Sequence, residues 1–186
     1  MPTVAVVPAA GKGERFGGAK LLALVGGETL LDRTLRSLLD AAIDRIILVV
    51  APGSDFSVVK TLVDPRVQIV RNPDPSRGMF SSIQCGVERA EGDPVLVLPA
   101  DMPFVRSETI ANVSATCARA NQIVVPTHGG KRGHPVAFPA SVRGAIAGAP
   151  PESTLKVALA STGGAQLEIP VDDPGVLRDV DVPSDL

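Results

Sequence analysis

The chain has 186 residues, a hydrophobic fraction of 45% and a formal net charge of -2, with 18 basic and 20 acidic side chains. A chain of this size and composition can bury a hydrophobic core without disulfides or a structural metal, which argues against disorder. The balanced charge, the lack of Trp and Tyr, and only 5 Phe exclude a dedicated nucleic-acid binder, which would need a basic surface and aromatic side chains for the bases.

Several features of the chain predict where it resides. No apolar run reaches the roughly 18 to 20 residues that would span a bilayer, so we expect no membrane insertion. The apolar opening at residues 1–10 lacks a basic stretch and contains Pro8, which favours a first strand over a signal peptide. Cys85 and Cys117 form no zinc-binding pattern, and we interpret them as small buried side chains in a reducing compartment. We therefore expect a cytoplasmic protein.

Short apolar runs rich in β-branched residues recur at residues 4–7, 46–50, 67–70, 95–98 and 123–125. Such runs are typical of strands buried on both faces of a parallel sheet. Helical periodicity is clearest at residues 30–39, where Thr29 and Asp32 resemble a capping box. Further helices are expected at residues 56–63, 82–90 and 109–120, with Ser81 and Ser107 as candidate N-caps. This alternation predicts a three-layer α/β/α fold with a mostly parallel sheet.

The pattern changes after Pro126. Gly129 and Gly130 predict a hairpin turn, residues 135–138 a return strand, and residues 140–147 and 154–160 two short helices. We therefore expect an antiparallel C-terminal portion that forms a lid or a wall of the binding site. In an open α/β sheet, ligands bind at the carboxyl ends of the strands, so the loop after the first strand is the first place to examine.

That loop, at residues 8–20, is rich in glycine and basic residues. It carries four glycines within eight positions, together with Lys12, Arg15 and Lys20. Backbone N–H groups of such a loop can turn inward as an anion nest, which predicts a polyphosphate site; a solvated glycine loop is the alternative. The spacing fits no Walker A loop, and Phe16 stands where a dinucleotide fingerprint needs glycine. Neither a P-loop NTPase nor an ordinary dehydrogenase is supported.

Asp101 follows the strand at residues 95–98 and is the second candidate. Because the carboxyl ends of parallel strands meet at one edge of a sheet, Asp101 should face the glycine-rich loop. Mg²⁺ binds one or two carboxylates together with phosphate oxygens, so Asp101 is placed to hold Mg²⁺ against a polyphosphate. An isolated Asp at a strand end is also a common turn or N-cap residue, and that alternative stays open.

Five short motifs follow one another along nearly the whole chain. They are Ala9-Ala10-Gly11-x-Gly13-x-Arg15-x-Gly17-x-x-Lys20, Asn72-Pro73-x-x-x-x-Gly78-Met79-x-Ser81-Ser82, Asp101-Met102-Pro103, Gly130-x-Arg132-Gly133-His134-Pro135 and Asp179-Val180-Asp181. In combination and order, these motifs resemble the MobA-like nucleotidyltransferases. Within that group, the sequence is most similar to the molybdenum cofactor cytidylyltransferases of the MocA type.

The resemblance implies a Rossmann-like nucleotidyltransferase domain over residues 1–186, with a nucleotide-binding half at about 1–105 and an acceptor-binding half at about 106–186. It implies Mg²⁺-dependent transfer of a nucleoside monophosphate from an NTP, CTP in preference to GTP, to a phosphorylated acceptor such as molybdopterin. For catalysis it points to Arg15, Lys20 and Asp101, and for the metal to Asp101 and Asp181. It assigns nucleotide binding to Ala9, Ala10, Gly11, Lys12, Gly13, Asn72, Gly78, Ser81 and Ser82, and acceptor binding to Arg132, Gly133 and His134.

The second half of the chain departs from the MocA-type pattern. Those enzymes often carry a Gly-Asp-x-Gly-Ala-Arg stretch, which residues 149–156 lack; there, Lys156 is either a contact for the acceptor phosphate or a solvated side chain. A sugar-phosphate or alditol-phosphate nucleotidyltransferase therefore stays open as an alternative. A protein that binds a nucleotide or cofactor without turnover is another, and substitution of Lys20 or Asp101 would separate binding from transfer.

Overall fold

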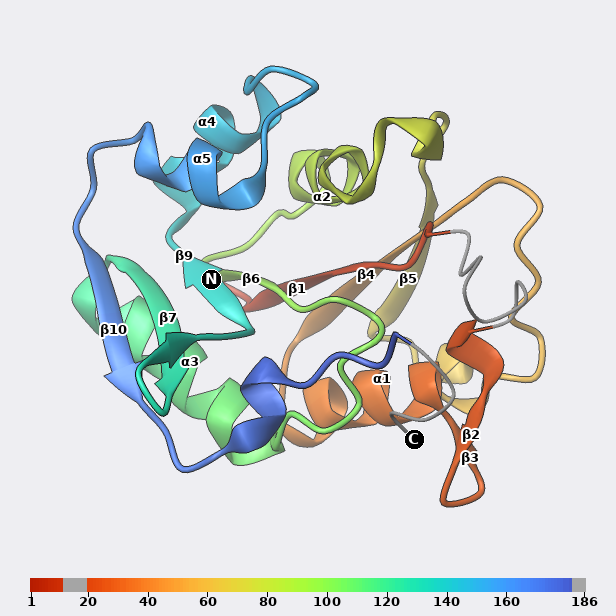
Figure 1. Ribbon diagram of the computed structural model, residues 1–186. Coiled ribbons are helices and arrows are strands. Elements are labelled where there is room, and N and C mark those ends of the chain that lie inside the picture. Colours follow the sequence, from red (N-terminus) through yellow and green to blue (C-terminus); the bar gives the residue numbers. More distant parts are fainter. Residues whose placement is uncertain (12–19, 182–186) are drawn as a thin grey trace.

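The computed structural model describes residues 1–11 and 20–181 (Figure 1). Within these residues, an eight-stranded sheet has the order β10-β7-β9-β6-β1-β4-β5, with β8 paired to β7. The pairs β1·β4, β1·β6, β4·β5 and β7·β10 are parallel, whereas β9 is antiparallel to β6 and β7. The strands are β1 Val4–Pro8, β4 Arg45–Val50, β5 Val67–Arg71, β6 Val95–Val97, β7 Ile123–His128, β8 Lys131–Arg132, β9 Val136–Phe138 and β10 Gln166–Pro170.

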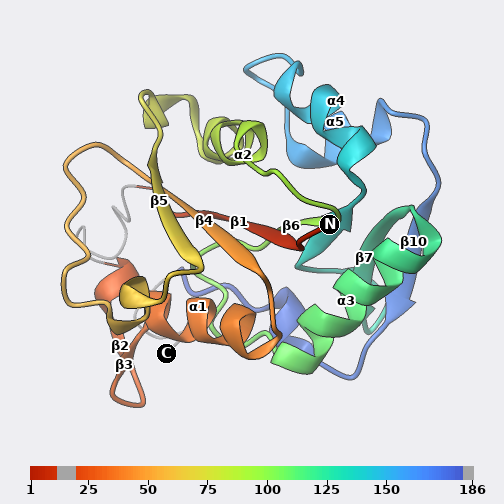
Figure 2. The same ribbon diagram turned by 180° about the vertical axis from the view of Figure 1, so that it is seen from behind.

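Helices cover both faces of the sheet (Figures 1 and 2). One face carries α1 (Leu30–Asp40) and α3 (Ser107–Ala120), and the other carries α2 (Met79–Glu88), α4 (Arg143–Ala147) and α5 (Leu155–Ala160). Each face has its own apolar core, since alternate residues of β1 join opposite clusters. The predicted three-layer α/β/α fold, mostly parallel with an antiparallel C-terminal portion, is confirmed.

Short elements connect these layers. A small antiparallel hairpin, β2 (Leu24–Val25) with β3 (Glu28–Thr29), precedes α1 and was not expected from the sequence. Five 3₁₀ helices complete the described elements: η2 Lys20–Leu22, η3 Lys60–Val63, η4 Pro75–Arg77, η5 Ala140–Val142 and η6 Pro174–Leu177. No helix in the described part of the chain has the length and apolar character needed to cross a membrane.

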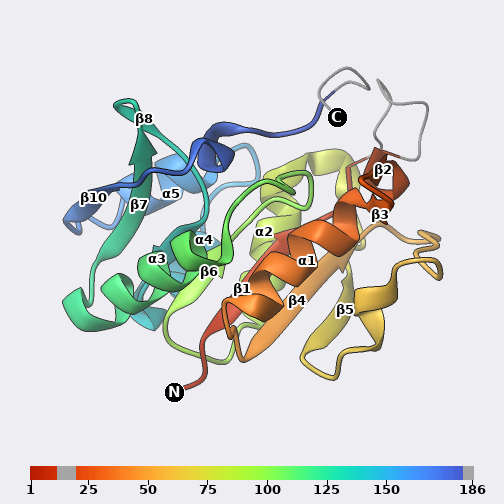
Figure 3. The ribbon, with the colours of Figure 1, turned by 90° about the horizontal axis from the view of Figure 1, so that it is seen from below.

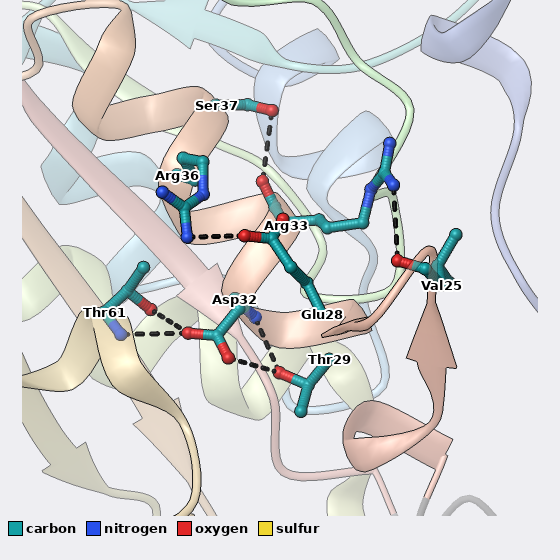
Figure 4. A network of polar contacts seen from close by, with 8 residues as sticks. All are labelled: Val25, Glu28, Thr29, Asp32, Arg33, Arg36, Ser37 and Thr61. Atoms are coloured by element: carbon teal, nitrogen blue, oxygen red, sulfur yellow. Dashed lines mark hydrogen bonds and ion pairs between the residues drawn. The ribbon is translucent and has the colours of Figure 1, made fainter.

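The start of α1 confirms the predicted cap. The hydroxyl oxygen of Thr29 accepts the N–H of Asp32 at 3.0 Å and donates to its carboxylate at 2.9 Å. The second carboxylate oxygen of Asp32 accepts the N–H and the hydroxyl of Thr61 at 2.9 and 3.0 Å (Figure 4). A buried carboxylate thus ties α1 to the segment between β4 and β5, and all of its partners are hydrogen-bond donors.

The helix predicted at residues 56–63 is wrong, because the structure has only the 3₁₀ turn η3 there. Four of those eight residues are β-branched, which lowers their helix propensity. The N–H of Thr61 is also bound by the Asp32 carboxylate, where a helix would need it for its own ladder. The connection from β4 to β5 is therefore largely irregular.

The two N-caps predicted for α2 and α3 are also wrong. α2 begins at Met79 after Gly78, whose φ of 87° favours glycine, and Ser81 lies in its first turn. α3 begins at Ser107, and the N–H of Arg106 before it donates to the carboxylate of Asp173 at 2.9 Å. The acceptor for α3 comes from a segment far along the chain, which local sequence cannot indicate.

The C-terminal portion follows the prediction more closely. Gly129 and Gly130, with φ of 56° and 77°, form the turn between β7 and β8, and β9 is the expected return strand. Both short helices are present as η5 with α4, and as α5. Strand β10 was not predicted. Cys85 and Cys117 are free and buried as expected, and burial raises the pKa of the Cys117 thiol to about 12.

Candidate active site

A cleft of about 970 Å³ lies at the carboxyl ends of β1, β4 and β6. The carboxyl ends of β1 and β4 lie at the edge of the sheet where the described chain ends (Figure 3). The cleft is lined by residues following each of these strands, by η2 and by the start of α2. This is the place where open α/β sheets bind ligands, and the volume is large enough for a nucleotide.

Three polar residues from distant parts of the sequence meet at this cleft. The ammonium of Lys20 donates to Oδ2 of Asp101 at 2.7 Å and to Oδ1 of Asp181 at 2.9 Å. The side chains of Lys20 and Asp101 are 13% and 20% exposed, whereas that of Asp181 is 53% exposed. The predicted convergence of the basic loop and Asp101 is therefore present for Lys20.

Local structure accounts for each position. Lys20 begins η2, whose two leucines pack against the core on the α1 face. Asp101 stands in the turn after β6, where the N–H of Ala100 donates to the carbonyl of Pro8 at 3.2 Å. Asp181 follows Val180, which is fully buried and whose N–H donates to the carbonyl of Asp101 at 3.0 Å. Backbone contacts thus hold both carboxylates beside the end of β1.

The two carboxylates keep Lys20 charged. Burial alone would lower the pKa of Lys20, but the hydrogen bonds and charges of Asp101 and Asp181 outweigh it and raise the pKa above the usual value. Asp101 and Asp181 already share one cation between them. Such a pair of carboxylate oxygens suits Mg²⁺, which takes one or two carboxylates and completes its shell with phosphate or water oxygens.

Most of the predicted nucleotide-binding residues lie at the cleft. The described residues that line it include Ala9, Ala10, Gly11, Gly78 and Ser82, together with Lys20, Asp101 and Asp181. Asn72 and Ser81 are buried and are not among the lining residues. The side-chain amide of Asn72 donates to the hydroxyls of Ser81 and Ser82 at 2.8 and 3.0 Å, so it supports the start of α2 from inside. Lys12, Gly13 and Arg15 lie outside the described residues.

A comparison with known families agrees with this arrangement. The family model of the MobA-like NTP transferase domain matches residues 5–167. The chain belongs to this family. The match includes every described residue that lines the cleft except Asp181.

Two curated relatives of this MobA-like protein are named cytidylyltransferases. It is 22% identical over 180 residues to the molybdenum cofactor cytidylyltransferase of Escherichia coli K12, covering 97% of this chain and 91% of that relative. It is 33% identical over 162 residues to the 2-C-methyl-D-erythritol 4-phosphate cytidylyltransferase of Rhodococcus opacus B4, covering 83% of this chain and 67% of that relative. The chain is a nucleotidyltransferase.

A solved structure has the same fold. The crystal structure of Rv0371c from Mycobacterium tuberculosis H37Rv superposes with a TM-score of 0.83 at 26% identity, covering 100% of this chain and 95% of that one. A second crystal structure, a complex of Rv0371c with manganese, superposes with a TM-score of 0.79 at 23% identity, covering 100% and 96%. The arrangement of strands around the cleft is therefore shared with a protein that has been crystallised in complex with manganese.

The residues predicted to bind the acceptor are not among those that line the cleft. Arg132, on β8, forms an ion pair with Glu168 of β10 at 3.5 Å. At Gly133 a Cβ atom would lie 2.3 Å from the carbonyl oxygen of Val176, so this position requires glycine. The N–H of His134 donates to the same carbonyl at 2.9 Å. Burial lowers the pKa of the His134 imidazole, and the charges of nearby Asp101 and Asp179 only partly oppose this effect.

Sequence reasoning missed one side of the cleft in this nucleotidyltransferase. The segment after β4 contributes Ser54, Asp55 and Phe56 to the lining, but the sequence predicted only a crossover helix that begins at residue 56. Hydrogen bonds from Ser57 to the Asp55 carboxylate hold its pKa below the usual value, so this lining group is an anion and a hydrogen-bond acceptor. Ligands bind at the carboxyl ends of the strands in open α/β sheets, and this rule, which pointed to the loop after β1, also points to the segment after β4.

Proposed function

We propose that this nucleotidyltransferase uses Mg²⁺ to transfer a nucleoside monophosphate from an NTP, CTP in preference to GTP, to a phosphorylated small molecule such as molybdopterin. The observation that carries the proposal is the meeting of Lys20, Asp101 and Asp181 at the cleft, with contacts of 2.7 and 2.9 Å. Both curated relatives described above are named cytidylyltransferases, which supports CTP. The molybdopterin acceptor is supported by the relative that covers 91% of its length.

Asp101 and Asp181 would hold the ion, which when bound neutralises charge on the reacting phosphates. The donor set fits, because both carboxylates are close enough to contact a single cation. The complex of Rv0371c with manganese is consistent with a divalent ion in a protein of this fold. Within residues 1–11 and 20–181, no group of three or more His, Cys, Asp and Glu side chains could hold a metal by itself.

The side chains of the cleft would act mainly by positioning and by neutralising charge. Lys20 would bind the triphosphate, with the backbone of Ala10 and Gly11 beside the nucleotide. A phosphate oxygen of the acceptor then forms a bond to the α-phosphorus, while the bond from that phosphorus to the β-phosphate oxygen breaks. Pyrophosphate leaves with the bonding electron pair, so no covalent intermediate on the chain is required.

A second candidate differs only in the acceptor. The Rhodococcus opacus relative is 33% identical and is named for 2-C-methyl-D-erythritol 4-phosphate, an alditol phosphate. The nucleotide side of the cleft would serve both reactions, because Lys20 and Asp101 contact groups common to every NTP. Residues 149–156 lack the stretch that MocA-type enzymes often carry, and this departure is consistent with an alditol-phosphate acceptor.

Pyrophosphate release tests the proposal. Each of the four NTPs is incubated with Mg²⁺ and either molybdopterin, 2-C-methyl-D-erythritol 4-phosphate or a set of sugar phosphates. We expect release with CTP and molybdopterin, and its loss in Lys20→Met and Asp101→Asn but not in Lys60→Met, which removes an exposed lysine outside the cleft lining. Release only with the alditol phosphate would support the second candidate. Nucleotide binding without release for every pair would instead indicate a non-catalytic binding protein.

A further inference from the structure

Asp101 and Asp181 meet because the C-terminal segment, residues 173–181, lies along the loop at residues 101–106. At one end, the N–H of Val180 donates to the carbonyl of Asp101 at 3.0 Å. In the middle, the guanidinium of Arg178 stacks on the ring of Phe104 at 3.9 Å from its centroid. These contacts place the last residue of the segment, Asp181, beside Asp101.

The other end of the segment is fixed by a buried carboxylate. Asp173 is only 2% exposed, and its Oδ2 accepts the N–H of Arg106 at 2.9 Å and the hydroxyl of Thr109 at 2.7 Å. Its Oδ1 accepts the N–H of Gly175 at 2.9 Å, which turns the segment into η6. An anion at the N-terminus of α3 is also favoured by the helix dipole. One side chain therefore joins the segment, the loop and α3.

Close packing makes this junction sensitive to small changes. A Cβ atom at Gly175 would lie 2.0 Å from the carbonyl oxygen of Phe104, so the two backbones are already in tight contact. Val176 and Val180, on either side of Arg178, are both fully buried. A shift at the Asp173 end would be transmitted along a short, packed stretch to Asp181.

We propose that Asp173 is a positioning residue for the divalent-ion site, acting through the segment that brings Asp181 to Asp101. The inference rests on the proposed function in one respect, namely that these two carboxylates hold the ion. Without the Asp173 carboxylate, the N–H of Arg106 and the hydroxyl of Thr109 lose their acceptor, and the segment is held to the loop that carries Asp101 only by the contacts nearer Asp181. The two metal-binding oxygens then lose their fixed separation.

Binding of Mn²⁺ alone, followed by the electron paramagnetic resonance signal of free Mn²⁺, tests the proposal without turnover. We expect Asp173→Asn to weaken Mn²⁺ binding about 10-fold or more, in the range found when a residue that supports a metal ligand is removed. Thr109→Val, which removes one contact and no charge, should weaken it less. Asp172→Asn is the matched control, since it removes an exposed carboxylate from the neighbouring position and should leave Mn²⁺ binding unchanged.

A second measurement separates positioning from general loss of structure. Affinity for CTP in the presence of EDTA should change less than two-fold in Asp173→Asn, because the nucleotide side of the cleft is built from β1, β4 and α2. Equal losses of CTP and Mn²⁺ affinity would indicate a purely structural role for Asp173 and overturn the inference. Unchanged Mn²⁺ binding in both Asp173→Asn and Thr109→Val would also overturn it. If the parent protein binds no Mn²⁺ and Asp101→Asn leaves the signal of free Mn²⁺ unchanged, the metal part of the proposed function is wrong. The inference about Asp173 is then wrong as well.

Discussion

Replacing Lys20 should have opposite effects on metal binding and on transfer. The ammonium of Lys20 contacts one oxygen of each carboxylate proposed to hold the ion. In Lys20→Met the two carboxylates keep their charges and lose their cation. The free protein should therefore bind a divalent ion more tightly, while transfer should fall because the triphosphate loses a positive contact.

The size of the first effect follows from the distances. The ammonium nitrogen lies 2.7 Å from Oδ2 of Asp101, and an ion bound to that same oxygen at about 2.1 Å would be no more than about 4.8 Å from the nitrogen. The repulsion between the two cations is then about 1.7 kcal/mol at the dielectric constant of water, and about 1 kcal/mol after screening at ~0.1 M salt. Removing Lys20 should tighten Mn²⁺ binding about 5- to 20-fold. If Lys20 instead moves away when the ion binds to the parent protein, its two ion pairs are lost. This loss also weakens metal binding in the parent protein, so Lys20→Met should again bind the ion more tightly.

The assays are Mn²⁺ titration without nucleotide and pyrophosphate release at saturating NTP. Loss of one preorganised contact to the transition state predicts a 10² to 10³-fold fall in turnover, by order of magnitude. Lys60→Met controls for the loss of one positive charge and should alter neither quantity. Weaker Mn²⁺ binding in Lys20→Met than in the parent protein would refute the reasoning, because it would mean that Lys20 supports the ion rather than competing with it.

Three further predictions concern buried positions outside the cleft lining. Gly133→Ala should lower the free energy of unfolding, measured with urea, by about 1–3 kcal/mol, because the added Cβ would lie 2.3 Å from a carbonyl oxygen. Gly144→Ala is the control and should not lower it, because no atom lies within 4 Å of the Cβ added there. Asp32→Ala should lower it by about 2–4 kcal/mol, because the N–H and hydroxyl of Thr61 lose a buried acceptor, and a loss below about 1 kcal/mol would contradict this. With a pKa raised by burial to about 12, the thiol of Cys117 should stay unlabelled by a thiol reagent at about pH 8 in the native protein and react after unfolding, as mass spectrometry would reveal.

The features that the sequence predicted correctly depend on local patterns and on one general rule. Strands β1, β4, β6 and β7 were found because each contains a short apolar run whose residues are buried. The run at residues 67–70 also predicted β5 correctly, although β5 is the edge strand and only Val70 in it is buried. Once these strands were assigned to one parallel sheet, their carboxyl ends had to share an edge. That rule alone placed Lys20 and Asp101 at a common site, and the ion pair of 2.7 Å between them bears it out.

The features that were missed depend on partners far apart in the chain. Asp32 and Asp173 each have one near partner, Thr29 and Gly175, but their other donors lie 29 and 64 or more positions away, so these links to distant segments have no local signature. The segment at residues 56–63 has apolar residues at helical spacing, but its backbone is bound by Asp32 instead. Strand β10 is half exposed and alternates polar with apolar residues, and it is a strand because it pairs with β7.

The motif at residues 130–135 illustrates why acceptor choice is harder to read than nucleotide binding. Gly133 is required by its close approach to Val176, and the N–H of His134 donates to the carbonyl of that same residue. Val176 belongs to η6, in the segment that ends at Asp181. Packing against η6 therefore accounts for these residue types, whichever acceptor is bound. A motif that packs against the segment carrying Asp181 would serve relatives with different acceptors equally well. The side chains that select the acceptor are therefore expected outside this motif, at positions that differ between such relatives.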